Sequence, residues 1–146
     1  MSAKPEELNR KRADDFKASF KGKIAGEVIN NTVSKLLQTT ATAYPANGSV
    51  ASLVIWMKWQ CQVTNGKQFN GSSWGIAFPG GGALIGDVYT NDITALYANT
   101  VSFAFTATPV YTALYFYDGN HNLLGSFQAG SVSTVTGAGG GSGSWS

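Results

Sequence analysis

Apolar and polar residues alternate with a period of two over much of the chain after residue 50, a pattern typical of half-buried β-strands. Asn65-Gly66 predicts a tight hairpin turn with two positive-φ positions, with the return starting at Lys67 and a second strand near residues 73–78. Before that turn, the clearest alternation predicts a strand over residues 52–63 with this inward face: Leu53, Ile55, Met57, Trp59, Cys61 and Val63.

Further strands are expected in the second half of the chain. Residues 101–107 alternate in the same way, whereas residues 110–117 are apolar on both faces. Such a run suits a central strand, or a strand whose outer face is covered by the N-terminal segment. Asp118-Gly119-Asn120 predicts another hairpin turn, and a last strand over residues 131–136 is expected to dissolve into a Gly-rich end.

Turn and cap signals divide these segments. Tyr44 to Gly48 reads as a turn cluster, and Pro79 to Gly82 as a second break that lacks the Gly-Lys-Ser/Thr of a phosphate loop. Thr90-Asn91-Asp92 predicts the cap of a short helix that ends near Thr100. Short strands joined by Gly and Asn turns indicate a mainly β fold, either an antiparallel barrel or a sandwich.

Residues 5–37 have a different period and predict a helical or partly disordered arm. Its sparse apolar stripe has intervals of four or eight, with basic residues around it. A basic amphipathic helix can lie on an anionic membrane, and the alternative is a helix packed on its own β domain. We therefore expect an arm over residues 1–43 and a β domain over residues 44–146, with these candidate contacts in the arm: Phe16, Lys17, Phe20, Lys21 and Lys23.

The charges follow the same division. Residues 1–35 carry eight basic and five acidic residues, a net charge of +3, whereas residues 36–146 carry two basic and three acidic residues, a net charge of −1. Only Lys58 and Lys67 of the β domain could meet phosphates, which argues against nucleic acid as a partner. A single histidine, His121, and a single cysteine, Cys61, leave little for a catalytic triad or a metal site. We expect no catalytic residue, no metal and no cofactor.

Two tryptophans are candidates for surface contact. The alternation places Trp56 on the polar face of its strand, and Trp74 lies near the expected return strand. Such rings stack on sugars or sit at a membrane interface, although a ring of this kind is more often covered by another element. A carbohydrate- or protein-binding module is therefore the alternative to a membrane-binding protein, and an enzyme of unfamiliar type is a third hypothesis.

The second half resembles the core domain of the virulence-associated Vap (VapA-like) proteins first known from rhodococcal pathogens. The resemblance covers roughly residues 50–146, and several motifs in order make it more specific than any one of them. The motifs are Gly86 to Asp92, Leu96 to Phe103, Tyr115 to Asn120 with Leu124-Gly125, and Gln128 to Ser133 before the Gly-rich end at Trp145.

The resemblance implies a closed eight-stranded antiparallel β-barrel with one short helix. It also implies a non-enzymatic protein, secreted or exposed at the cell surface, that acts on host phagosomal or lysosomal membranes by binding lipid or a host protein. The polar start of the chain, Met1 to Glu7, does not have the apolar run of a secretory signal, so no signal peptide is expected. Small eight-stranded barrels are often filled by side chains, and a filled barrel must act from its outside.

Overall fold

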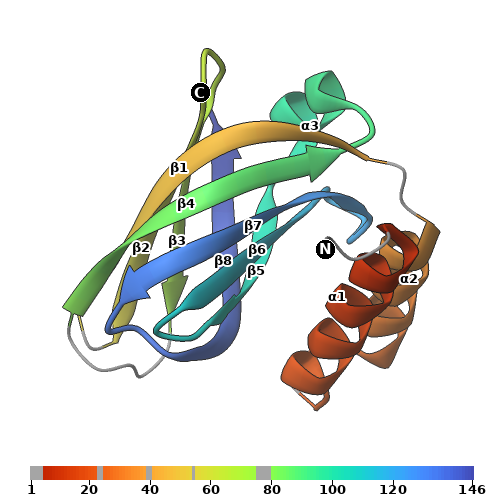
Figure 1. Ribbon diagram of the computed structural model, residues 1–146, viewed down its shortest axis with the longest axis horizontal. Helices are drawn as coiled ribbons and strands as arrows, with labels where there is room; N and C mark the ends of the chain where they lie inside the picture. The colour runs from red at the N-terminus through yellow and green to blue at the C-terminus, as the bar shows by residue number, and fades with distance from the viewer. Residues whose placement is uncertain (1–4, 23–24, 39–40, 54, 75–79) are drawn as a thin grey trace.

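A computed structural model describes residues 5–22, 25–38, 41–53, 55–74 and 80–146, and shows two helices followed by a β-barrel (Figure 1). The arm consists of α1 (Pro5–Phe20) and α2 (Gly26–Gln38), and a short helix α3 (Ile93–Asn99) lies between β4 and β5. The strands are β1 (Thr42–Ser52), β2 (Trp56–Val63), β3 (Gln68–Trp74), β4 (Gly80–Thr90), β5 (Ser102–Ala107), β6 (Tyr111–Tyr117), β7 (Leu123–Ser133) and β8 (Gly137–Trp145).

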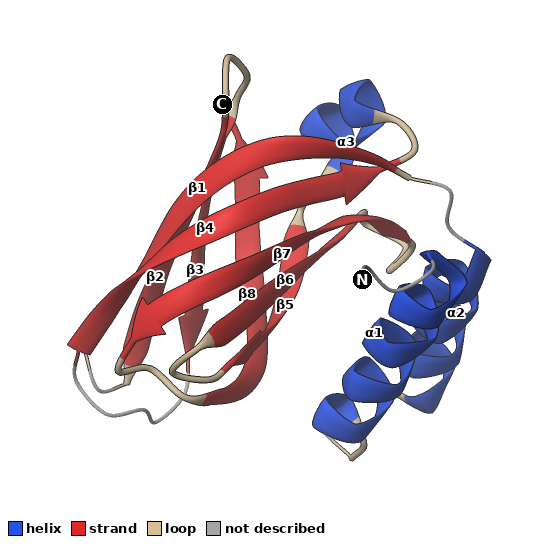
Figure 2. Ribbon diagram, viewed as in Figure 1, coloured by secondary structure: helices blue, strands red, loops and turns tan. Residues whose placement is uncertain are grey.

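The eight strands close into one barrel in the order β1-β2-β3-β8-β5-β6-β7-β4, and every neighbouring pair is antiparallel (Figure 2). The order contains two Greek keys, because β4-β1-β2-β3 and β8-β5-β6-β7 each have the spatial order 4-1-2-3 of that motif. Closure leaves no free sheet edge. The prediction of a mainly β fold is confirmed, and of the two predicted architectures, barrel and sandwich, the structure has the barrel.

Side chains fill the interior of the barrel. Trp59 and Phe69 have no exposed surface, and the ring of Phe69 lies 5.3 Å from that of Phe103 and 4.9 Å from that of Phe116. Trp59 donates its indole N–H to the Ser73 hydroxyl at 3.1 Å, which satisfies a buried donor. The barrel therefore has to work from its outer surface and its ends.

The Gly-rich C-terminal segment is a regular strand, so the prediction that it dissolves was wrong. β8 pairs with both β3 and β5 and closes the barrel. A Cβ at Gly143 would lie 2.5 Å from the ring of Phe69, and one at Gly140 would lie 2.8 Å from the carbonyl oxygen of Phe103. Glycine is needed here because the aromatic core and the neighbouring backbones leave no space for side chains. The preceding strand ends at Ser133, not at residue 136.

Two predicted breaks also lie inside strands. Tyr44 to Gly48, predicted as a turn, belongs to β1, and Gly80 to Gly82, predicted as a break, opens β4. Pro45 is tolerated because the β1–β2 ladder begins only at the next residue, opposite Val63. Gly48 faces a close backbone, since a Cβ there would lie 2.5 Å from the Gln60 carbonyl oxygen. Pro79 lies outside the described residues.

The hairpin after β2 forms where it was predicted, but only Asn65 has a positive φ, 61°. β2 begins at Trp56, so Leu53 and Ile55 are not on its inward face and are 62% and 59% exposed. β3 runs over Gln68–Trp74 rather than residues 73–78, and residues 75–78 of that prediction lie outside the described part. The cap of α3 is confirmed: Asp92 accepts the N–H of Ala95 at 3.0 Å.

Candidate functional site

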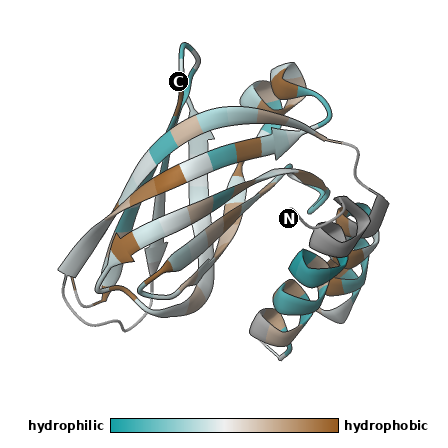
Figure 3. Cartoon of the chain, in the orientation of Figure 1, coloured by the Kyte–Doolittle hydropathy of each residue, from teal (hydrophilic) through white to brown (hydrophobic). Residues whose placement is uncertain are grey.

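The arm packs its apolar face against the outside of the barrel. Ala13, Phe16 and Phe20 share one face of α1 because they are spaced by three and four residues, and all three are buried. The ring of Phe16 lies 4.7 Å from that of Tyr115 on β6, edge to face, and 4.6 Å from that of Phe20. Figure 3 shows stretches of hydrophilic residues along the ribbons of both arm helices.

The barrel offers an apolar outer strip to receive the arm. Ala104, Ala113, Tyr115 and Tyr117 form one buried cluster with the arm residues, apart from the core inside the barrel. A buried hydrogen bond of 2.9 Å joins the hydroxyls of Thr32 on α2 and Tyr117 on β6. The run over residues 110–117 is therefore apolar on both faces because one face fills the barrel and the other carries the arm, as one of the two predicted explanations required.

This docking buries the two phenylalanines that were candidates for membrane contact. Phe16 and Phe20 have no exposed surface, so neither can contact a membrane while the arm stays docked. Lys17 and Lys21 are exposed, and Lys23 lies outside the described residues. Within the described part of the chain, no helix combines the length and hydropathy needed to cross a bilayer.

The exposed side of α1 carries a basic stripe, which we define as Arg10, Asp14, Lys17 and Lys21. Spacings of four, three and four residues place these side chains along one face, and all four are exposed. Lys21 follows the last residue of α1, Phe20, and its backbone N–H still donates to the carbonyl oxygen of Lys17 at 3.1 Å, so it continues the line of the helix. Three cations and one carboxylate give the basic stripe a net charge of +2. Part of the net positive charge of the arm therefore lies on this one exposed stripe.

The two tryptophans lie on another part of the barrel. Trp56 opens β2, is half-buried, and is the register partner of Trp74 at the end of β3. The structure does not describe the side chain of Trp74. The arm packs on the outer strip of β5 and β6, which are not neighbours of β2, so the structure does not bring these tryptophans together with the arm residues.

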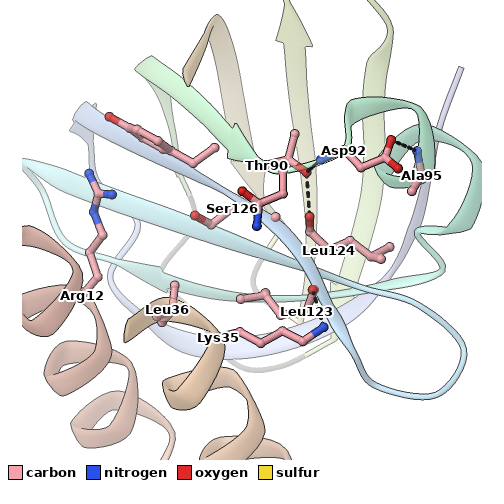
Figure 4. A pocket seen from close by; sticks show the side chains of 12 residues that line it. Arg12, Lys35, Leu36, Thr90, Asp92, Ala95, Leu123, Leu124 and Ser126 are labelled. Atoms are coloured by element: carbon pink, nitrogen blue, oxygen red, sulfur yellow. Dashed lines mark hydrogen bonds between the residues drawn. The ribbon is translucent and has the colours of Figure 1, made fainter. Parts of the chain in front are cut away.

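A cleft of about 350 Å³ lies between the arm and one end of the barrel (Figure 4). Arg12 of α1 and Lys35 of α2 enter it from the arm, and the other wall is formed by Tyr89 to Asp92, Ala95, and Leu123 to Ser126. Sequence reasoning did not find this cleft. Nothing in the local pattern relates Arg12 to Lys35, and they line the same cleft only because the two helices pack side by side on the barrel.

Arg12 lies at the border of this cleft and contacts an aromatic ring of the barrel. Its guanidinium lies 4.4 Å from the centre of the Tyr89 ring, a cation–π contact. It also borders a second hollow of about 290 Å³ that Asp15 and Tyr111 line. Burial raises the pKa of Tyr111 to about 12, although the nearby Arg12 opposes this shift. The Tyr111 hydroxyl donates to the side-chain oxygen of Gln128.

Other titrating groups are buried rather than poised for chemistry. Burial raises the pKa of Tyr115 and Tyr117 well above the usual range, and the hydrogen bond between Tyr117 and Thr32 opposes the shift at Tyr117. Burial likewise raises the pKa of the Cys61 thiol, which has no exposed surface in the core. Among the described residues, no group of three or more His, Cys, Asp or Glu side chains is placed to hold a metal ion.

Comparison with known proteins identifies the family of this chain. The family described as Rhodococcus equi virulence-associated protein matches residues 2–146. The chain is similar to the solved virulence-associated proteins VapB and VapD from the intracellular pathogen Rhodococcus equi, with 38% and 31% identity and TM-scores of 0.69 and 0.68, each match covering 73% of this chain and 98% of the other. Comparison with curated proteins found no match. The chain therefore belongs to the Rhodococcus equi virulence-associated protein (Vap) family.

Proposed function

We propose that this Vap-family protein acts without catalysis, by associating with an anionic membrane surface through the basic stripe of α1. The observation that carries the proposal is the stripe itself, which projects Arg10, Lys17 and Lys21 into solvent while the apolar face of the same helix is held by the barrel. The barrel contributes little positive charge, because Lys58 and Lys67 are its only basic residues after Thr42.

The expected binding is weak and depends on salt. A Lys or Arg at an anionic membrane surface contributes about 1 kcal/mol, so three cations opposed by one carboxylate give roughly 2 kcal/mol. This attraction decays over a Debye length of about 8 Å at physiological ionic strength. A docked arm should therefore hold the protein reversibly at the surface, with retention that falls as salt is added.

Co-sedimentation with vesicles of phosphatidylcholine and phosphatidylglycerol tests the proposal. We expect retention of the full chain at low salt and its loss in Lys17→Glu/Lys21→Glu. The matched control is Lys58→Glu/Lys67→Glu, which makes the same change of net charge at exposed positions of the barrel and should retain binding. Failure of the unmodified chain to bind, or equal loss in both double variants, would refute a specific role for the basic stripe.

The barrel also favours a second candidate, binding of a protein partner at the end away from α3. Leu53 and Ile55, between β1 and β2, are largely exposed, as is Val110 between β5 and β6, which is 76% exposed. Exposed apolar residues gathered at one end of a barrel are typical of contact surfaces. Such binding should survive Lys17→Glu/Lys21→Glu and be lost in Leu53→Ser/Ile55→Ser, which a pull-down with host-cell extract and both variants would separate.

A further inference from the structure

The cleft between the arm and the barrel is separate from the basic stripe and has the size of a small-molecule site. Its volume of about 350 Å³ falls at the lower end of the range for ligand pockets, roughly 300–1,000 Å³. A compact organic molecule fits this volume, whereas the acyl chains of a phospholipid do not.

Two cations reach into the cleft from different helices. Arg12 is half-buried against Tyr89, and the Lys35 ammonium donates to the carbonyl oxygen of Leu123 over a long 3.4 Å. Within the part of the chain that the structure describes, neither cation forms an ion pair. The carboxylate that lines the cleft, Asp92, is engaged in capping α3, and Asp118, which acts electrostatically on Lys35, is not part of the lining.

The arm side of the cleft is apolar between the two cations, whereas the barrel side also carries the hydroxyls of Thr90 and Ser126. Figure 4 shows Leu36 between Arg12 and Lys35 on the arm side, and Leu124 on the barrel side. Leu36 is only 5% exposed. A ligand that matched this lining would carry a negative group toward each end and methylene groups in the middle.

We propose that the cleft binds a small dicarboxylate, with one carboxylate on Arg12, the other on Lys35, and the methylene spacer against Leu36. Hydrogen bonds between ionised partners are about twice as strong as neutral ones, and the planar guanidinium suits a carboxylate in particular. A monocarboxylate of the same size can satisfy only one of the two cations. The ligand joins α1 to α2 inside a cleft whose other wall is the barrel, so the site is complete only while the arm is docked, and binding should stabilise the docked arm by mass action.

The test is calorimetric titration of the full chain with succinate, glutarate and adipate, with butyrate as the monocarboxylate of matched apolar size. We expect one of the three dicarboxylates to bind at least tenfold more tightly than butyrate. Arg12→Gln and Lys35→Gln should each weaken that binding at least tenfold, and Lys17→Gln, on the exposed side of α1, should leave it unchanged. Hydrogen exchange of α1 amides should slow when the ligand is added.

Arg12→Gln and Lys35→Gln could weaken binding simply by releasing the arm from the barrel. A variant on the barrel side of the cleft tests the site without changing the arm. Asn91→Asp adds a negative charge to the lining without touching α1 or α2, and it should abolish binding. Asn47→Asp, at another exposed position, on β1 and outside the cleft lining, should have no effect. The proposal is overturned if no dicarboxylate binds, if butyrate binds equally well, or if Arg12→Gln, Lys35→Gln and Asn91→Asp all leave binding intact. None of these outcomes bears on vesicle retention through the basic stripe.

Discussion

Phe16→Ala is the substitution that best measures how firmly the arm is docked. The ring has no exposed surface and lies within 4.7 Å of the rings of both Phe20 and Tyr115. Removing a buried Phe side chain costs about 3–5 kcal/mol, and we take about 3 kcal/mol because water can refill a site between arm and barrel more easily than a closed core. Since about 1.4 kcal/mol is a factor of ten, the docking equilibrium should weaken roughly a hundredfold.

Hydrogen exchange of α1 amides measures this loss, and alkylation of Cys61 follows the barrel separately. Cys61 is buried in the barrel core, so a thiol reagent reaches it only when the barrel opens. We expect α1 exchange to accelerate roughly a hundredfold, while alkylation of Cys61 stays unchanged. Lys17→Ala, the neighbouring exposed position, should alter neither rate. Equal acceleration at α1 and at Cys61 would show that arm and barrel open as one unit, and would refute the reasoning.

Two further predictions concern the barrel strands and alkaline pH. Gly141→Ala should lower the free energy of unfolding, measured by urea titration, by about 1–3 kcal/mol, because its Cβ would collide with the carbonyl oxygen of Ser72. In the control variant Gly130→Ala the new Cβ meets only an ordinary contact at 3.9 Å. The free energy of unfolding of this control should change by less than about 0.5 kcal/mol. Burial raises the pKa of Tyr115 and Tyr117, so the folded chain keeps protons that the unfolded chain loses, and their stabilising effect is complete below about pH 10 and lost above it. Release of the arm, followed by α1 exchange corrected for its intrinsic pH dependence, should begin only above about pH 10 and bring ionisation of both tyrosines with it, seen as tyrosinate absorbance; release of the arm at lower pH would contradict this cause.

The sequence predicted those elements whose two faces have different surroundings. β2 was predicted because Met57 and Trp59 are buried in the filled barrel while Lys58 is exposed, so apolar and polar residues alternate along the strand. The α3 helix was found from its cap, since the Asp92 side chain satisfies a backbone N–H locally. The helical arm was found from its apolar spacing, although the pattern left open whether Phe16 met a membrane or the barrel.

Elements defined by their neighbours in space could not be predicted in this way. β8 is nearly all Gly and Ser, so it carries no alternation, and its place as a strand is imposed by β3 and β5 on either side. The Gly80 to Gly82 segment of β4 is similar: a Cβ at Gly81 would lie 2.9 Å from the Val50 carbonyl oxygen across the ladder. The cleft depends on the packing of α1 beside α2, which no local pattern encodes.

Thr32→Val tests whether the docked arm limits membrane binding. It removes the buried hydrogen bond to Tyr117 but leaves Phe16, Phe20 and the basic stripe intact. An unpaired buried hydroxyl costs about 1–3 kcal/mol, so the released arm should become roughly tenfold more populated. A released arm can place both phenylalanines among the headgroups in addition to its cations, so we expect retention on anionic vesicles to rise, and the rise to persist at high salt because apolar burial is not screened. Faster α1 exchange in Thr32→Val without greater retention would restrict the membrane contact to the basic stripe.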